Sequence, residues 1–221
     1  MIRKLMQCLL PLVLAVPLHT AQAATPEGWV IAMAWSPQYC RDNRAIGADQ
    51  PQCLEDHAFD LRSLEPRFAQ GEGADCSEES LSPELAERAM WVLPNKAELR
   101  KGWRRNGACS GLAMDEYIMQ LSRARERISI PETYRGLDGK LPLSRTALVE
   151  SFVGSNDGLD PKNVIPVCSG RWLREVRFCV SSEFEFQGCG VELADQCPEQ
   201  IEMRAHPVMR ARPAALGSGT Y

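Results

Sequence analysis

Nine cysteines in 221 residues, eight of them beyond a short N-terminal apolar segment, constrain the fold of this chain most strongly. The segment combines two basic residues, an apolar run over 9–18 and the small-residue sequence Ala21-Gln22-Ala23. This pattern is typical of a secretory signal peptide over residues 1–23, and the run is too short for the alternative, an uncleaved membrane anchor. An even number of cysteines behind an export signal indicates a disulfide framework in an oxidising compartment. We therefore expect a periplasmic or secreted protein that has no membrane segment after signal cleavage.

The remaining composition limits the kinds of partner. About 198 residues suit one domain, expected over 24–209, followed by a flexible Arg/Pro/Gly-rich tail over 210–221. Because 23 basic and 29 acidic residues leave a net charge of −6, any nucleic-acid contact needs a local cationic patch. The chain beyond the signal has no CxxC pair and only His57 and His206 as histidines, which argues against a zinc site. We expect no metal, no cofactor and a monomeric protein.

Apolar patterns predict the strands. Residues 28–35 are almost wholly apolar, which predicts a central strand buried on both faces. Residues 57–64 predict a second strand that ends before Pro66, with His57 and Arg62 on opposite faces. Two later strands are expected over 164–168 and 173–180, with a candidate extension of the sheet at 183–186. The polar stretch between Cys40 and Cys53 predicts a closed surface loop.

Helix signals occupy the middle of the chain. A serine followed by proline predicts a helix over 82–94. Asn95 with Glu98 resembles a capping box, which opens a helix that ends at Gly107. Two further helices are expected over about 112–127 and 144–156, separated by a loop that contains proline and glycine. No linker or internal repeat divides the chain, so we expect a single domain.

Several motifs in this order resemble the ribonuclease T(2) family of secreted endoribonucleases. Ala34-Trp35-Ser36-Pro37 with Cys40 is similar to the end of that family's first strand, W-[SP]-P-x-x-C. The family's first active segment, F-x-x-HGLWP-x4-G-x4-C, is matched without a gap at Phe59, Leu64, Pro66, Gly71 and Cys76. Its second active segment, HEWxKHGTCSGL, is matched at Trp103, Gly107, Cys109, Ser110, Gly111 and Leu112, with Arg105 in place of lysine. The resemblance implies an α+β domain with a central, mainly antiparallel sheet flanked by helices and crossed by disulfides.

The same resemblance implies how the cysteines pair. Cys76 should bridge Cys109 and tie the two active segments together. The other implied bridges are Cys40–Cys53, Cys168–Cys197 and Cys179–Cys189. The sequence by itself leaves the connectivity open, because eight cysteines allow on the order of 100 pairings.

The chain departs from the family where the chemistry should be. The histidine of the first segment falls at Arg62, and the family's glycine and tryptophan fall at Ser63 and Glu65. In the second segment the two histidines fall at Lys101 and Asn106, and the glutamate falls at Gly102. Every histidine of the two active segments is therefore replaced.

These replacements remove the groups that the family reaction requires. That reaction, transphosphorylation to a 2′,3′-cyclic phosphate, needs a base and an acid that titrate near the operating pH. Arginine stays protonated, asparagine transfers no proton, and lysine is a poor base unless burial lowers its pKa. Glu65 could be an ion-pair partner for Lys101 and Arg62 or a weak base, while His57 is expected to be a surface or core residue. We therefore expect no catalytic residue.

Four cations remain near the altered positions: Arg62, Lys101, Arg104 and Arg105. They could hold a phosphate or a carboxylate, or they could form a solvated helix face. The preferred reading is an inactive protein of the ribonuclease T(2) fold that binds RNA, a nucleotide or a protein partner at the former active-site cleft. The alternatives are a weak or altered endoribonuclease that uses Lys101, Arg62 or Glu65, and a structural envelope protein without a ligand.

Overall fold

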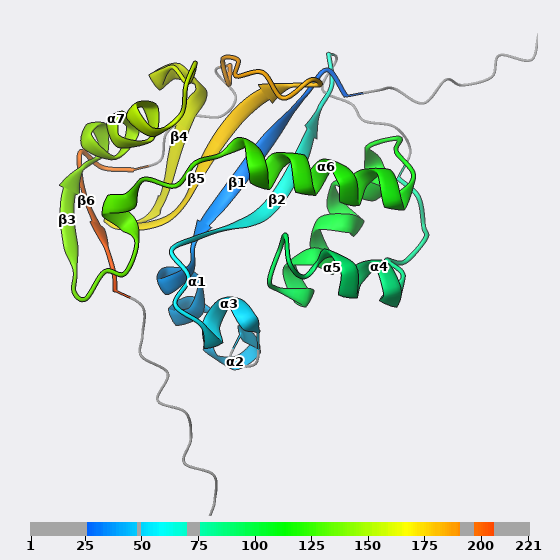
Figure 1. Cartoon of the computed structure of the whole chain (residues 1–221), viewed down its shortest axis with the longest axis horizontal. Helices are drawn as coiled ribbons and strands as arrows, with labels where there is room; N and C mark the ends of the chain where they lie inside the picture. The colour runs from blue at the N-terminus through cyan, green and yellow to red at the C-terminus, as the bar shows by residue number, and fades with distance from the viewer. Residues whose placement is uncertain (1–25, 48–49, 70–75, 191–196, 206–221) are drawn as a thin grey trace, which may run out of the picture.

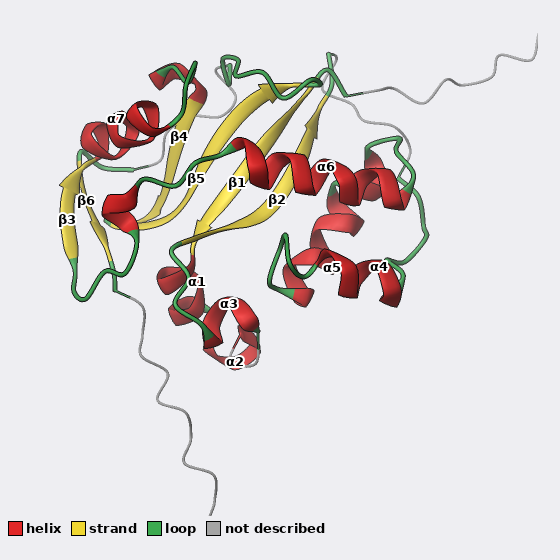
Figure 2. Ribbon diagram, viewed as in Figure 1, coloured by secondary structure: helices red, strands yellow, loops and turns green. Residues whose placement is uncertain are grey.

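A computed structural model describes residues 26–47, 50–69, 76–190 and 197–205 (Figure 1). The expected signal peptide, the ends of the expected domain at 24–25 and 206–209, and the expected tail lie outside these described residues. The described part has an α+β fold in which helices pack against a curved sheet (Figure 2). Neighbouring strands pair antiparallel, except for one parallel pair between Trp172 and Glu202. The expectation of a mainly antiparallel sheet is confirmed.

The sheet is built around β1 and β5, two long strands that pair with each other although they are far apart in the sequence. Its strands are β1 (Gly28–Trp35), β2 (Phe59–Arg67), β3 (Leu141–Ser144), β4 (Val164–Ser169), β5 (Trp172–Ser181) and β6 (Gln200–Met203). The order across the sheet is β2-β1-β5-β6-β3, and β4 pairs with β5. All residues of β1 are buried, as expected for a central strand. The sequence did not predict β3 and β6, and residues 183–186 form only an isolated bridge between Phe186 and Val180.

The second strand runs further than the sequence predicted. It begins at Phe59, so His57 precedes it, and it continues through Pro66 to Arg67. Proline lacks the amide hydrogen that an interior strand needs for pairing. Because β2 lies at the edge of the sheet, its outward side needs no partner, and Pro66 is tolerated opposite Trp29.

The helices agree with the predicted ones except near the first disulfide. They are α1 (Ser36–Asp42), α2 (Arg44–Gly47), α3 (Pro51–Leu54), α4 (Pro83–Ala89), α5 (Lys96–Arg105), α6 (Met114–Arg127) and α7 (Arg145–Ser155). Short 3-10 turns are η1 (Gly107–Cys109), η2 (Glu132–Tyr134) and η3 (Pro161–Asn163). The stretch between Cys40 and Cys53 is closed by their disulfide, but it is largely helical and not the predicted loop. It contains the end of α1, all of α2 and the start of α3, and prolines occupy the first turns of α1 and α3.

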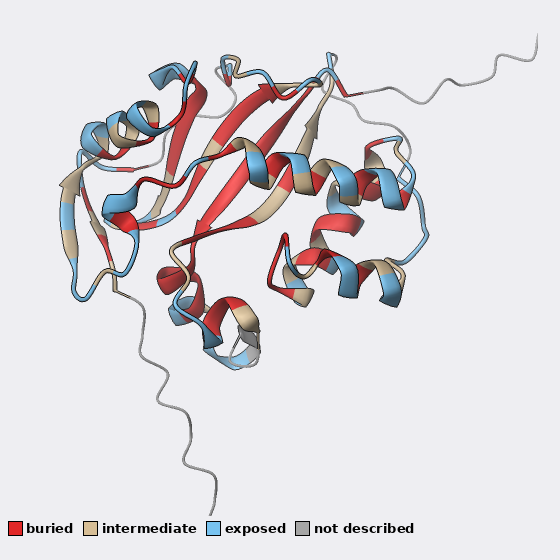
Figure 3. Ribbon diagram, in the orientation of Figure 1, coloured by how far each residue is buried: buried red, intermediate tan, exposed pale blue. Residues whose placement is uncertain are grey.

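The main core lies between the sheet and the helices α4 to α7. Figure 3 shows the buried inner surfaces of β1, β5 and the facing helices. Phe152 of α7 contacts Phe59 and Phe178 edge-on, with ring centroids 5.4 and 5.1 Å apart. On the other side of the core, Trp103 of α5 and Tyr117 of α6 pack together, which confirms Trp103 as a core anchor. α6 lies across β1 and β2, and α4 and α5 lie beyond the edge of β2 (Figure 1).

All four implied disulfides are present. They are Cys40–Cys53, Cys76–Cys109, Cys168–Cys197 and Cys179–Cys189. Cys179 and Cys189 are buried with Val30 and Ile165 in a small cluster apart from the main core. The Cys76–Cys109 bridge closes a loop of 33 residues and ties η1, just after α5, to the segment that follows β2.

Gly107 allows the chain to pass close to the core at the end of α5. A Cβ atom at this position would collide with the rings of Trp103 and Tyr117, both of which are buried. Gly107→Ala is therefore expected to lower the free energy of unfolding by about 1–3 kcal/mol, because two packed rings must move. Urea unfolding followed by circular dichroism measures this change.

Gly154→Ala in α7 is the matched control for that substitution. Nothing lies within 4 Å of a Cβ at Gly154, so alanine there should raise stability by about 0.5–1 kcal/mol through helix propensity. Equal effects of the two variants would contradict a packing role for Gly107.

Candidate functional site

The edge strand β2 and helix α5 meet at a cavity of about 290 Å³. The residues that line it are Arg62, Ser63, Glu65, Glu98, Lys101, Gly102, Arg105, Asn106 and Arg177. The positions at which the resemblance places the family's histidines, Arg62, Lys101 and Asn106, thus lie around one cavity. Arg104, which we grouped with these cations, is exposed on α5 and is not part of the lining.

A β-bulge in β2 directs Arg62 into the cavity. Ala32 of β1 pairs with Ser63 and Met33 pairs with Leu61, so Arg62 is the extra residue between them. Such a bulge shifts the alternation of side chains along the strand. Leu61 and Leu64 therefore both face the core, while the consecutive residues Arg62 and Ser63 both line the cavity.

Small side chains form the floor beside the cavity. Ala32 and Ala34 of β1 pair with Arg177 and Glu175 of β5, on the face opposite the main core. Because these alanines are short, side chains from β2 and β5 can meet above β1. Arg62 of β2 reaches over Ala34 in this way and donates a hydrogen bond through NH1 to Glu175 Oε2.

Glu175 is the buried centre of an ion-pair network. It is 1% exposed, and its second oxygen accepts a hydrogen bond from Arg177 Nε at 2.7 Å. Burial alone would raise the pKa of Glu175, but Arg62 and Arg177 outweigh it and lower the pKa. Burial alone would likewise lower the pKa of Arg62, but Glu175 and Glu98 reverse this and raise it. Arg62 is thus a fixed cation that is already occupied by two carboxylates.

Glu98 brings α5 into the same network. Asn95 caps the helix, because its Oδ1 accepts hydrogen bonds from the amides of Ala97 and Glu98, each at 3.1 Å. A full capping box would also have the Glu98 side chain accept a hydrogen bond from the Asn95 amide, and the described contacts do not include this bond. The Glu98 carboxylate instead lies 3.3 Å from Arg62 Nε and 3.5 Å from Lys101 Nζ. Glu98 Oε1 also accepts a hydrogen bond from the Tyr39 hydroxyl at 3.4 Å.

Glu65 does not pair with Arg62 or Lys101, which corrects the expected ion pair. Its carboxylate accepts a hydrogen bond from Ser63 at 2.9 Å and lies 3.9 Å from Arg177 NH1. Arg62 is held by two acidic residues, Glu98 and Glu175, to which the sequence assigns no site role. The sequence signal for Glu175 is that it is the single carboxylate of β5, in a strand whose neighbouring cations are Arg174 and Arg177.

His57 lies in a different cavity, away from the altered positions. Its Nδ1 is 2.9 Å from Asp60 Oδ1, and this hydrogen bond is the main reason that its pKa is raised. The second cavity, of about 320 Å³, is also lined by Arg125 and Arg135. The expected separation of His57 from Arg62 is confirmed, although His57 precedes β2 and does not share its alternation. His206 lies outside the described residues.

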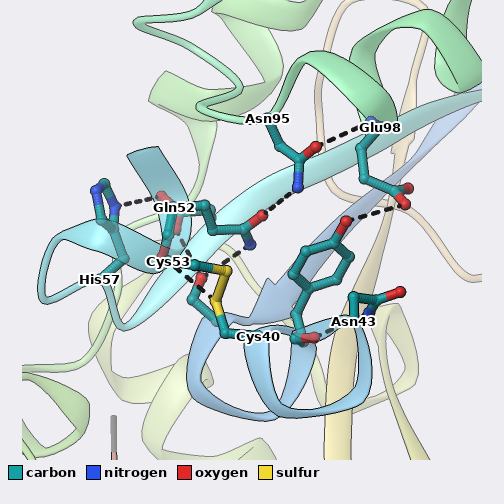
Figure 4. The surroundings of a disulfide bond; sticks show 10 residues. Cys40, Asn43, Gln52, Cys53, His57, Asn95 and Glu98 are labelled. Carbon is teal, nitrogen blue, oxygen red and sulfur yellow. Dashed lines mark hydrogen bonds and ion pairs between the residues drawn. A yellow bond between two sulfur atoms is a disulfide. The ribbon is translucent and has the colours of Figure 1, made fainter. Parts of the chain in front are cut away.

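A buried polar chain connects the His57 side to the start of α5 (Figure 4). Asp60 accepts a hydrogen bond from the Ser36 hydroxyl at 2.6 Å, and Ser36 accepts one from Gln52 at 3.0 Å. Gln52 in turn accepts a hydrogen bond from Asn95 at 2.9 Å, beside the Cys40–Cys53 bridge. Because these groups are buried and satisfied, they fix the first turn of α5 against α3 and β2.

The described residues contain no group of three metal-ligating side chains. The side chains that line the cavity carry guanidinium, ammonium, carboxylate, amide and hydroxyl groups. Such groups can bind anions and hold their orientation.

Comparison with known proteins identifies the fold. No protein-family model matches the chain. A curated Aeromonas hydrophila protein named ribonuclease is 26% identical over 195 residues, which cover 84% of this chain and 83% of that protein. Among solved structures, the RNase-related protein from Calystegia sepium has a TM-score of 0.64 at 14% identity and covers 82% of this chain and 98% of its own. RNase NT in complex with 5′-AMP has a TM-score of 0.62 at 16% identity, with coverage of 80% and 98%. The chain is therefore a protein of the ribonuclease T(2)-type fold.

Proposed function

We propose that this protein binds RNA or nucleotide phosphates in the cavity between β2 and α5 and does not cleave RNA by histidine chemistry. One observation carries the proposal: Lys101 and Arg105 present cations to a cavity whose lining, among the described residues, contains no imidazole. A fold shared with a ribonuclease that was solved with 5′-AMP supports a nucleotide as the ligand.

The binding cations are Lys101 and Arg105 rather than Arg62. Arg62 is held by Glu98 and Glu175, so a phosphate would have to displace a carboxylate to reach it. Arg105 is exposed at the mouth of the cavity and has no ion-pair partner among the described residues. Lys101 is only half-buried, and its 3.5 Å contact with Glu98 is long for an ion pair. These two side chains can turn toward a phosphate without breaking a buried contact.

Proton transfer is the step that the lining supports least. A guanidinium at Arg62 stays charged at any operating pH, and the amide of Asn106 transfers no proton. Loss of a general acid or base typically reduces the rate about 10²–10⁴-fold for each role. Glu98 is held by Arg62 and Lys101, so Glu65, beside Ser63 and Arg177, is the carboxylate of the lining that a weak endoribonuclease could use.

The cellular context that we propose is an oxidising one, reached by export with removal of residues 1–23. Four disulfides in the described structure support it, since such bonds persist outside the reducing cytosol. Among the described helices, none has the length and apolar character needed to cross a membrane.

Replacing both candidate phosphate ligands tests the binding site. Lys101→Ala/Arg105→Ala is expected to weaken binding of a fluorescein-labelled single-stranded RNA roughly 10-fold, because two charge-assisted contacts are lost. The magnitude of the slope of log affinity against log salt should also fall by about 1.4, because each phosphate contact on a single strand contributes about 0.7. Fluorescence anisotropy of the oxidised protein over a salt series measures both changes.

Helix α5 supplies the matched control. Arg100→Ala/Arg104→Ala removes two exposed cations from the same helix that do not line the cavity, and it should leave affinity within about 2-fold. Equal weakening by both double variants would refute the cavity as the site, and failure to bind RNA at all would favour a protein partner or a structural role. The enzymatic alternative is tested by analysing the ends of the RNA after incubation with the protein. If 2′,3′-cyclic phosphate ends form with the unaltered protein and are absent with Glu65→Gln, the protein retains cleavage activity.

A further inference from the structure

A second cationic surface surrounds the ring of Trp172 at the start of β5. The guanidinium carbon of Arg204 lies 3.2 Å from the ring centroid, and that of Arg171 lies 5.2 Å away. The ammonium of Lys140 lies 5.5 Å from the same centroid. Trp172 is only half-buried, while Arg171 and Lys140 are exposed. We call Trp172 with Arg41, Lys140, Arg171 and Arg204 the Trp172 platform.

Positive charge is in excess on this platform. Arg41, Lys140 and Arg204 line a cavity of about 240 Å³ that no described carboxylate lines. The nearby acidic groups are already engaged, since Glu202 pairs with Arg171 at 3.0 Å and Asp42 lies 3.9 Å from Arg174. Partial burial and then the charge of Arg41 lower the pKa of the Arg204 guanidinium. Cations that repel one another in this way are stabilised when an anion binds among them.

Residues that neighbour the platform in the sequence line a cavity that adjoins the one between β2 and α5. A narrower cavity of about 140 Å³ shares Arg62, Glu98 and Lys101 with that site and extends to Arg174 and Asp42. Arg174 lies two residues after Trp172 on β5, and Asp42 follows Arg41 on α1. Since a strand rises about 3.3 Å per residue, Trp172 and the cavity residue Arg177 are roughly 17 Å apart along β5. One extended ligand can therefore contact both places.

We infer that the ligand is a single strand of RNA several nucleotides long, which runs from the cavity to the Trp172 platform. The inference rests on the proposed function and adds the length and path of the ligand. Bases stack on guanidinium planes, and Arg204, whose own inner face covers the Trp172 ring at 3.2 Å, offers its outer face for such a contact. Arg41, Lys140 and Arg171 are placed around this pair where they can contact the backbone phosphates. A mononucleotide held in the cavity would leave the platform empty.

Ligand length and platform substitutions together test the inference. Lys140→Ala/Arg171→Ala, which changes two exposed side chains, should weaken binding of a single-stranded RNA of about 12 nucleotides roughly 10-fold. The same variant should bind 5′-AMP as the unaltered protein does. Arg88→Ala/Lys162→Ala, which removes two exposed cations that line neither cavity nor platform, is the control and should change neither affinity.

The outcomes separate this inference from the proposed function. Weakening of the long RNA alone by the platform variant, together with weakening of both ligands by Lys101→Ala/Arg105→Ala, supports both. Sensitivity to the cavity variant with indifference to the platform variant overturns the inference and leaves the proposed function standing. Indifference to the cavity variant refutes the proposed function and, with it, the path of the strand. Equal competition by polyglutamate of similar length would also overturn the inference, because it would show that base stacking contributes nothing.

Discussion

Glu175→Gln is expected to lower the free energy of unfolding by about 3 kcal/mol. The carboxylate is 1% exposed and pairs with Arg62 through one oxygen and with Arg177 through the other, so its neutralisation leaves two guanidinium groups without their main partner. Breaking a buried ion pair from one side typically costs about 3–5 kcal/mol, and the lower value applies here because Arg62 and Arg177 are 24% and 26% exposed and keep some water. Urea unfolding at neutral pH measures the loss.

The same variant makes a prediction about pH. The folded state lowers the pKa of Glu175 below its ordinary value of 4.5, so the network stabilises the protein above that value. This contribution is lost as the pH falls through the lowered folded pKa. The difference between the unaltered protein and Glu175→Gln should therefore be constant near neutral pH and should shrink below about pH 4.5.

A double-mutant cycle tests whether the loss of stability in Glu175→Gln comes from its interaction with Arg62. Arg62→Met leaves Glu175 with Arg177 alone, and the combined variant Arg62→Met/Glu175→Gln should lose less than the sum of the two single variants. Glu132→Gln, which breaks the exposed 3.3 Å pair with Arg135, is the control and should cost less than about 1 kcal/mol. Strict additivity of Arg62→Met and Glu175→Gln would contradict a coupled network.

Local patterns in the sequence were enough to predict most elements of the fold. β1 was predictable because an unbroken apolar run has few alternatives to a central strand. The caps at Ser82, Asn95 and Ser144 located three helix starts, since each side chain accepts a hydrogen bond from an amide of the first turn. By contrast, β3 and β6 have four residues each, which is too short to show alternation, and they form through pairing with each other.

The sequence was enough to predict which altered family positions line the cavity, but not which ion pairs they form. The alignment of motifs brought Arg62, Lys101 and Asn106 to one cavity, as the structure shows. It could not reveal that Glu175 reaches Arg62, because that contact depends on the β-bulge at Arg62 and on the small side chain of Ala34 between the two strands. Both features come from the pairing of strands that are far apart in the sequence.

Removal of the Cys76–Cys109 bridge should separate the stability of the fold from the geometry of the cavity. The bridge closes a loop of 33 residues, and the chain-entropy relation gives about 4 kcal/mol for a loop of that length. Cys76 is exposed and Cys109 is half-buried, so Cys76→Ala/Cys109→Ala removes little packing and acts mainly on the unfolded chain. Urea unfolding should therefore show a loss of about 4 kcal/mol.

Affinity for RNA should change much less in this variant. Helix α5 is fixed independently by the Asn95 cap and by Leu99 and Trp103, which are 2% exposed in the main core. Lys101 and Arg105 therefore keep their places while the native state is populated, and the dissociation constant should stay within about 2-fold of the original value. A strong loss of affinity with little loss of stability would contradict this reasoning. It would mean that the bridge positions the end of α5 in the native state, and that the cavity depends on the disulfide rather than on the core beneath it.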